Sequence, residues 1–187
     1  MRIHKIIFLD IDGVLVTSRC LLATAKYPTF DSASCKLLGK ICQLAPARIV
    51  ICSAWREERT RPAFQDILLR NGIPKHRLHE DWATPVLGGS RSREVRGWLE
   101  VHPEVSHYAI VDDGIGLDDE PSHLVAPNPD WGVGIKEVIE ICALLDINFA
   151  KWFGSCNLKP STEELELYAR RQTHVPKRGQ KDQARVL

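Results

Sequence analysis

An apolar run that ends abruptly in two carboxylates and a glycine constrains this chain more than any other feature. Residues 6–9 read Ile-Ile-Phe-Leu, and they are followed by Asp10, Ile11, Asp12 and Gly13. A short, continuous apolar run is typical of a strand that is buried on both faces of a sheet. Because side chains alternate along an extended chain, such a strand would present Asp10 and Asp12 on the same side at its open end.

Apolar, β-branched runs alternate with helical periodicity through much of the chain, which predicts βαβ crossovers and a mostly parallel sheet. The expected strands lie at Lys5–Leu9, Arg48–Cys52, His107–Val111 and His123–Ala126, with a short candidate strand at Arg77–His79. The expected helices lie at Ser34–Leu44, Arg61–Asn71, Arg93–Val101 and Gly134–Leu145. Helices on both faces of a five-stranded sheet would give an α/β fold with three layers.

Length and composition indicate one domain with a C-terminal extension. A chain of 187 residues with 44% hydrophobic content can bury one sizeable core and is short for two. We expect the domain to span residues 1–155. In residues 156–187, the segment from Ser161 to Glu164 resembles a capping box that opens a helix, and the basic tail after this helix is expected to be flexible.

Charge and cysteine content exclude several classes of protein. The formal net charge is +1, so bulk electrostatics gives the chain no preference for nucleic acids or membranes. The six cysteines form no CxxC pair, which favours reduced, buried thiols. The apolar run before Asp10 is too short for a signal peptide, and no segment is long enough to span a membrane. We expect a soluble, cytoplasmic protein with no obligate protein partner.

Polar residues follow three of the expected strands. Asp10 and Asp12 follow the first, Ser53 follows the second, and Asp112 and Asp113 follow a later one. The carboxyl ends of parallel strands meet at one edge of a sheet, where ligands bind. Carboxylates that converge there would repel one another and raise one another's pKa values unless a cation lies between them. Hard oxygen ligands of this kind suit Mg²⁺.

These residues resemble known motifs. Phe8–Leu15 resembles the first motif of the haloacid dehalogenase (HAD) superfamily of phosphohydrolases. Ser53 is similar to that family's second motif, and Asp112 and Asp113 are similar to its fourth. The resemblance covers about residues 3 to 147 and implies a Rossmann-like α/β/α sandwich without a large cap.

The third motif of the family is a lone Lys or Arg at the start of a helix. Arg91 is the expected residue, with Arg93 as the alternate. Ser53–Arg56, the Trp98-Leu99 pair and the Val111–Asp113 edge further resemble the HAD domains of RNA-repair proteins.

The resemblance implies a chemistry for each residue. Asp10 would attack phosphorus and form an aspartyl-phosphate, while Asp12 would protonate the leaving group and then deprotonate water. Mg²⁺ would be held by the carboxylate of Asp10, the backbone carbonyl of Asp12 and the carboxylate of Asp112. Asp113 would be a second ligand or would support the first, and which of these two acids contacts the metal directly stays open.

Three further residues would bind the phosphate. Ser53 would donate a hydrogen bond to a phosphoryl oxygen, and Arg91 would neutralise charge in the transition state. Gly13 would let the chain turn so that backbone N–H groups face the phosphate. Ser53 could also serve as the N-cap of the segment that follows it.

The spacing of the motifs leaves little room for a cap domain, which predicts an open cleft and a bulky substrate such as the terminal phosphate of RNA or DNA. Trp55 and Trp82 would lie near its rim with Arg56, Arg59 and Arg61, a mixture suited to bases and phosphates. In the alternative, both tryptophans are partly buried packing residues. Two alternatives stay open: a phosphatase of a small metabolite, and a non-catalytic phospho-acceptor or interaction module on a HAD-like scaffold.

Overall fold

Five strands form one sheet in the computed structural model, which describes residues 4–23, 29–114, 122–157 and 159–173. The strand order is β3-β2-β1-β4-β5, and every neighbouring pair is parallel. This confirms the predicted α/β sandwich. The strands are β1 (His4–Leu9), β2 (Ala47–Ile51), β3 (Leu78–Ala83), β4 (Val105–Val111) and β5 (Leu124–Val125).

The third strand differs from its prediction. The sequence predicts a short strand at Arg77–His79 and an irregular stretch through Trp82, whereas β3 continues to Ala83. It is an edge strand, paired only with β2, and Leu78 is its one fully buried residue. An edge strand with one covered side needs no continuous apolar run, so hydrophobic patterning underestimates its length.

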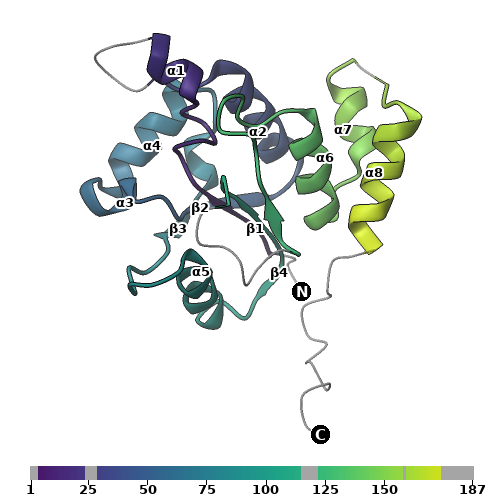
Figure 1. Ribbon diagram of the computed structural model, residues 1–187. Coiled ribbons are helices and arrows are strands. Elements are labelled where there is room, and N and C mark those ends of the chain that lie inside the picture. Colours follow the sequence, from purple (N-terminus) through teal and green to yellow (C-terminus); the bar gives the residue numbers. More distant parts are fainter. Residues whose placement is uncertain (1–3, 24–28, 115–121, 158, 174–187) are drawn as a thin grey trace, which may run out of the picture.

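The two faces of the sheet are covered by different helices. The larger core joins Ile7 and Leu9 of β1 to residues of α2 (Ser32–Leu44), α4 (Arg61–Arg70) and α6 (Ile135–Leu144). The smaller core joins Ile6 and Phe8 of β1 to α5 (Arg91–Glu100), which Figure 1 shows on the opposite side of the sheet. Alternate residues of the buried part of β1, residues 6–9, therefore supply both cores, as the apolar run predicts.

Hydrogen bonds set the helix ends that periodicity places less well. The carboxylate of Asp31 accepts hydrogen bonds from the backbone N–H of Ser34 (2.8 Å) and from its hydroxyl (2.9 Å), so α2 begins before the predicted start. Helices of one or two turns carry too little periodicity to be predicted. Those missed are α1 (Ser18–Ala23), α3 (Trp55–Glu58), η1 (Lys75–Arg77) and α7 (Phe149–Ser155).

The last described helix, α8 (Thr162–Thr173), packs on the domain next to α6. The backbone N–H of Ser161 donates to the carboxylate of Glu164 (2.6 Å), and the Glu164 N–H donates to the Ser161 hydroxyl (3.2 Å). This confirms the predicted capping box. The hydroxyl of Tyr168 donates to the Ile147 carbonyl (2.9 Å), which ties α8 to the chain before α7. The boundary after residue 155 stays a prediction, and the expected flexible tail lies outside the described residues.

All six cysteines are free. Cys35, Cys42, Cys52 and Cys142 are buried, as expected, while Cys20 and Cys156 are half-buried. Burial raises the pKa of Cys35, Cys42 and Cys142 to about 12, which leaves almost no thiolate at neutral pH. Among the described helices, none combines the length and the apolar content needed to cross a bilayer.

This burial predicts a pattern of thiol reactivity. With a chromogenic disulfide reagent at neutral pH, we expect the two half-buried cysteines to react first, and all six to react after denaturation in guanidinium chloride. The time course of reagent release in native and denatured protein gives the two counts. Rapid reaction of all six thiols in the native protein would contradict the packing described.

Candidate active site

The site lies where the strand order reverses. The chain runs from β1 out to β2 and β3 and then returns to β4 on the other side of β1, so the carboxyl ends of β1 and β4 flank a crevice. Hydrogen bonds continue past the strand ends: the N–H of Asp10 donates to the Val111 carbonyl (3.0 Å), and that of Cys52 donates to the Leu9 carbonyl (3.0 Å). The sheet itself therefore fixes the backbone at Asp10 and just before Ser53.

Three carboxylates gather at this crevice. Oxygen atoms of Asp10, Asp112 and Asp113 all lie within 4.8 Å of one another. Asp10 and Asp112 are 7% and 1% exposed. Burial, followed by the charge of Asp10, raises the pKa of Asp112 to about 7, and Arg91 opposes this shift. Burial and repulsion therefore make the Asp112 carboxyl harder to ionise than an exposed aspartate.

One guanidinium bridges the two adjacent strand ends. Nη1 of Arg91 lies 3.0 Å from Oδ1 of Asp10 and 3.0 Å from Oδ2 of Asp112. Arg91 is the first residue of α5, where Ser90 caps the helix by accepting from the N–H of Arg93 (3.4 Å). The side chain of Arg93 is exposed. Arg91 and not Arg93 therefore contacts the acidic cluster.

The turn after Asp10 needs a glycine. Gly13 has a φ of +71°, and a Cβ placed on it would lie 2.9 Å from Oδ2 of Asp113. The sharp turn predicted at this position is thus confirmed. The N–H of Gly13 donates to the Val16 carbonyl (2.8 Å), so this amide is already engaged within the turn. A phosphate contact of Gly13 stays a prediction.

Asp12 lies beside the cluster and not in it. Its Oδ2 accepts a hydrogen bond from the indole Nε1 of Trp55 (2.9 Å). Although the residue reaches solvent, partial loss of water around the carboxyl raises its pKa, while the bond from Trp55 lowers it and the charge of Asp10 raises it. A metal contact through the Asp12 backbone carbonyl is left as a prediction.

Ser53 is 1% exposed and lies two residues after the end of β2. Its hydroxyl oxygen accepts a hydrogen bond from the N–H of Trp55 (3.4 Å) at the start of α3. Because a hydroxyl can accept and donate at once, the same group keeps a proton for a phosphoryl oxygen. The N-cap of α3 is Ala54, which makes no side-chain capping hydrogen bond, so the expected N-cap role of Ser53 is wrong. A hydrogen bond from Ser53 to a phosphoryl oxygen stays a prediction.

Two residues near the expected rim are directed inward. Trp82 is partly buried and packs against Phe64 of α4, with ring centroids 5.2 Å apart, as the packing alternative predicts. Arg56 is 8% exposed, and its guanidinium donates to the carbonyls of Cys52 (2.7 Å), Ser53 (2.8 Å) and Thr84 (3.0 Å). A side chain that satisfies three strand-end carbonyls is not available to a substrate, so the predicted rim position of Arg56 is wrong.

Arg56 braces the site through an ion pair with α5. Its Nη2 lies 2.7 Å from Oε2 of Glu94, which is one turn after Arg91 on that helix. The pair thus joins the end of β2, which carries Ser53, to the helix that carries Arg91. Sequence reasoning missed this link. The available signal was a glutamate on the same helical face as Val95 and Trp98, where only an apolar residue or a paired charge is expected.

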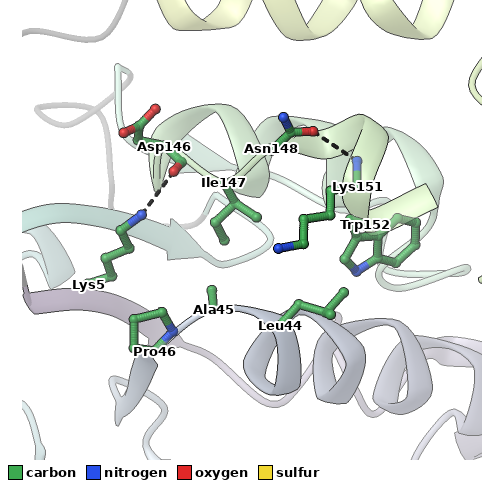
Figure 2. Close-up of a pocket in the computed structure, with 9 residues that line it drawn as sticks. All are labelled: Lys5, Leu44, Ala45, Pro46, Asp146, Ile147, Asn148, Lys151 and Trp152. Carbon is green, nitrogen blue, oxygen red and sulfur yellow. Dashed lines mark hydrogen bonds between the residues drawn. The ribbon is translucent and has the colours of Figure 1, made fainter. Parts of the chain in front are cut away.

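A groove at the opposite edge of the sheet has a different character. It has a volume of about 200 Å³ and lies between the end of α2 and the start of α7, with Lys5 of β1 at one side (Figure 2). Nζ of Lys5 donates to the carbonyl of Asp146 (2.9 Å). The lining of the groove is mostly apolar and contains none of the residues of the acidic cluster.

Comparison with known protein families shows which family the chain belongs to. Residues 6–138 match the family model described as the HAD domain in Swiss Army Knife RNA repair proteins. The chain belongs to this family. The match runs from β1 into α6 and includes the acidic cluster, Ser53, Arg56 and Arg91. It confirms the resemblance to the HAD domains of RNA-repair proteins, while α8 lies outside it. No curated protein and no solved structure matches the chain.

The buried Arg56–Glu94 ion pair should have a large effect on stability. Arg56→Ala should lower the free energy of unfolding by about 3–5 kcal/mol, because it leaves the carboxylate of Glu94 buried without its partner. Urea unfolding followed by circular dichroism measures this change. Lys136→Ala is the matched control, since its exposed ammonium makes only a long contact with Glu137 (3.9 Å), whose carboxylate keeps its hydrogen bond from the Gly134 N–H, and the substitution should cost less than about 1 kcal/mol. Equal effects of the two substitutions would contradict the structural role of the Arg56–Glu94 pair.

Proposed function

We propose that this HAD-family protein is a Mg²⁺-dependent phosphohydrolase that acts through an aspartyl-phosphate on Asp10 and takes a bulky phosphoester, the terminal phosphate of RNA or DNA. The observation that carries the proposal is the juxtaposition of Asp10 with Asp112, Asp113 and Arg91 at one strand edge. The family supports a phosphohydrolase role in general terms, and the metal, the intermediate and the substrate are inferred from the site.

The donor set fits a hard divalent cation. Three carboxylates within 4.8 Å meet one guanidinium, which leaves an excess of negative charge in a largely buried position. Asp10, Asp112 and Asp113 would hold Mg²⁺ together with the backbone carbonyl of Asp12. When bound, Mg²⁺ would offset the repulsion between these carboxylates and an incoming phosphate.

Asp10 and Asp12 divide the chemistry between them. The Asp10 carboxylate attacks phosphorus, and the bond to the leaving oxygen breaks as that oxygen takes a proton from Asp12. Asp12 then removes a proton from water, which attacks phosphorus and releases Asp10 and inorganic phosphate. The Trp55 indole holds the Asp12 carboxyl by a 2.9 Å hydrogen bond, which limits its rotation during both proton transfers.

Ser53 and Arg91 would bind the phosphoryl oxygens. Their positions come from different elements, the end of β2 and the start of α5, and the Arg56–Glu94 pair fixes one relative to the other. Arg91 would exchange part of its contact with the carboxylates for the phosphoryl group, where negative charge builds in the transition state.

Two observations favour a bulky nucleic-acid end over a small metabolite. The matching family is described by its occurrence in RNA repair proteins. In the described part of the chain, only the short helix α1 and a loop lie between Gly13 and α2, so no large domain there covers the crevice. An open site can admit the end of a polymer.

Loss of the nucleophile should abolish turnover. Asp10→Asn is expected to lower phosphate release from an aryl phosphate in the presence of Mg²⁺ by roughly 10³-fold or more, because an amide cannot form the aspartyl-phosphate. Asp66→Asn, at an exposed position on α4, is the matched control and should retain full activity. Undiminished activity of Asp10→Asn would exclude the mechanism, and a stable phosphoprotein without turnover would favour the phospho-acceptor alternative.

The buried acid should govern metal affinity. Asp112→Asn is expected to raise the dissociation constant for Mg²⁺ by roughly 10-fold or more, as measured by isothermal titration calorimetry and by the Mg²⁺ concentration for half-maximal activity. Asp113→Asn in parallel shows which of the two acids contributes more. Chelation should abolish activity and added Mg²⁺ should restore it. Full activity after exhaustive chelation would contradict the metal requirement.

A further inference from the structure

Two arginines lie over indole rings near the candidate active site. The guanidinium carbon of Arg59 is 4.1 Å from the ring centroid of Trp55, and that of Arg19 is 4.2 Å from the ring centroid of Trp131. Trp131 is 61% exposed, and the Arg19 and Arg59 side chains are 48% and 32% exposed. The Trp131–Arg19 pair therefore presents both a ring and a positive charge to solvent, while Trp55 is half-buried and the Trp55–Arg59 pair reaches solvent only in part.

Both pairs are attached to the turn that carries the catalytic acids. Trp55 contacts it through the hydrogen bond to Asp12. Trp131 lies in a loop that packs on the same turn, since a Cβ placed on Gly13 would be 3.2 Å from Cβ of Pro129. Gly132, next to Trp131, lies so close that a Cβ there would be 2.6 Å from the Val14 carbonyl oxygen.

The surroundings hold the two rings in place. Phe30 packs edge-on against Trp55, with centroids 5.8 Å apart. Arg19 donates to the carbonyl of Asp130 (2.8 Å), which anchors α1 to the loop that carries Trp131. Pre-organised aromatic rings lose little freedom when a ligand stacks on them.

The chemistry of the pairs selects a partner. An indole ring bearing a guanidinium stacks on the face of any unpaired base and attracts the phosphates beside it. An apolar protein segment would cover the guanidinium groups and remove water from them without offering an anion or a hydrogen-bond acceptor, so it fits this surface poorly. The acidic partners of the arginines, Asp31 at 3.6 Å and Glu58 at 3.8 Å, form weak, partly exposed pairs that a phosphate can displace.

We propose that the Trp55–Arg59 and Trp131–Arg19 pairs bind the nucleotides next to the terminal phosphate of a single-stranded nucleic acid. This inference rests on the proposed phosphohydrolase function and deepens it, because it assigns the residues that distinguish a strand end from a lone phosphoester. Single strands are selected because only unpaired bases offer a free face for stacking.

The test compares four phosphorylated substrates: an aryl phosphate, a mononucleotide, a single-stranded oligonucleotide and a blunt duplex with the same terminal phosphate. We expect kcat/KM to be highest for the single-stranded oligonucleotide. Trp131→Ala should reduce the ratio of its kcat/KM to that of the aryl phosphate by roughly 5- to 100-fold, the range expected for loss of one stacked base. Trp131→Phe should restore most of this ratio.

Direct binding gives a second readout. Fluorescence anisotropy with a labelled oligonucleotide and the Asp10→Asn protein should show weaker binding after Trp131→Ala or Arg59→Ala. The matched control is Val101→Ala, which removes an exposed apolar group just after α5, at the other edge of the sheet. It should leave binding unchanged.

The outcomes separate the two proposals. Failure to hydrolyse any of the four substrates would overturn the proposed function. Hydrolysis of the aryl phosphate without an advantage for the single strand, or with an advantage that Trp131→Ala does not reduce, would overturn the stacking proposal alone. Equal activity on the blunt duplex and the single strand would also overturn it.

Discussion

The bridge from Arg91 to Asp10 and Asp112 is the interaction on which the rest of the site depends. Two buried carboxylates at adjacent strand ends would repel each other strongly, and Nη1 of Arg91 lies 3.0 Å from both. The sheet fixes the acids, and α5 fixes the guanidinium. The Arg56–Glu94 pair then joins α5 to the end of β2, so that three separate strand ends and one helix act as a single unit.

This arrangement neutralises the acidic cluster only in part. With Asp113 included, the carboxylates still outnumber the guanidinium, and burial together with the charge of Asp10 raises the pKa of Asp112 to about 7. A site with this excess of negative charge would repel a phosphate on its own. It becomes suited to phosphate when a divalent cation shares the carboxylates, which is why the proposed chemistry includes Mg²⁺.

The sequence predicts the parts of this structure that depend on burial and order along the chain. The apolar run before Asp10 forms β1, in the buried centre of the sheet. Asp10 and Asp12 follow β1, and Asp112 and Asp113 follow β4, which is its neighbour in the sheet. Buried strands appear in the sequence as clear apolar runs. In a parallel sheet their carboxyl ends lie at the same edge, irrespective of the loop conformations. The family match confirms the identity that these motifs suggest.

The parts that sequence reasoning missed depend on side-chain direction. Nothing in the spacing shows that Arg56 turns inward to Glu94 while Arg59 turns outward over Trp55. Arg19 and Trp131 are far apart in the chain, and only the folded structure brings them into contact. Local patterns carry no information about such contacts, which tertiary packing decides.

The central claim is that Asp10 carries the phosphoryl group, and peptide mass spectrometry of an acid-quenched reaction tests it most directly. In the Asp12→Asn variant the residue that activates water is missing. An aryl phosphate, whose leaving group departs without a proton from Asp12, should still transfer its phosphoryl group to Asp10, so the aspartyl-phosphate should accumulate. One added phosphoryl group is expected on the peptide that contains Asp10, and none is expected in the Asp10→Asn protein. Release of phosphate with no modification of that peptide, or a phosphoryl group on another residue, would contradict it.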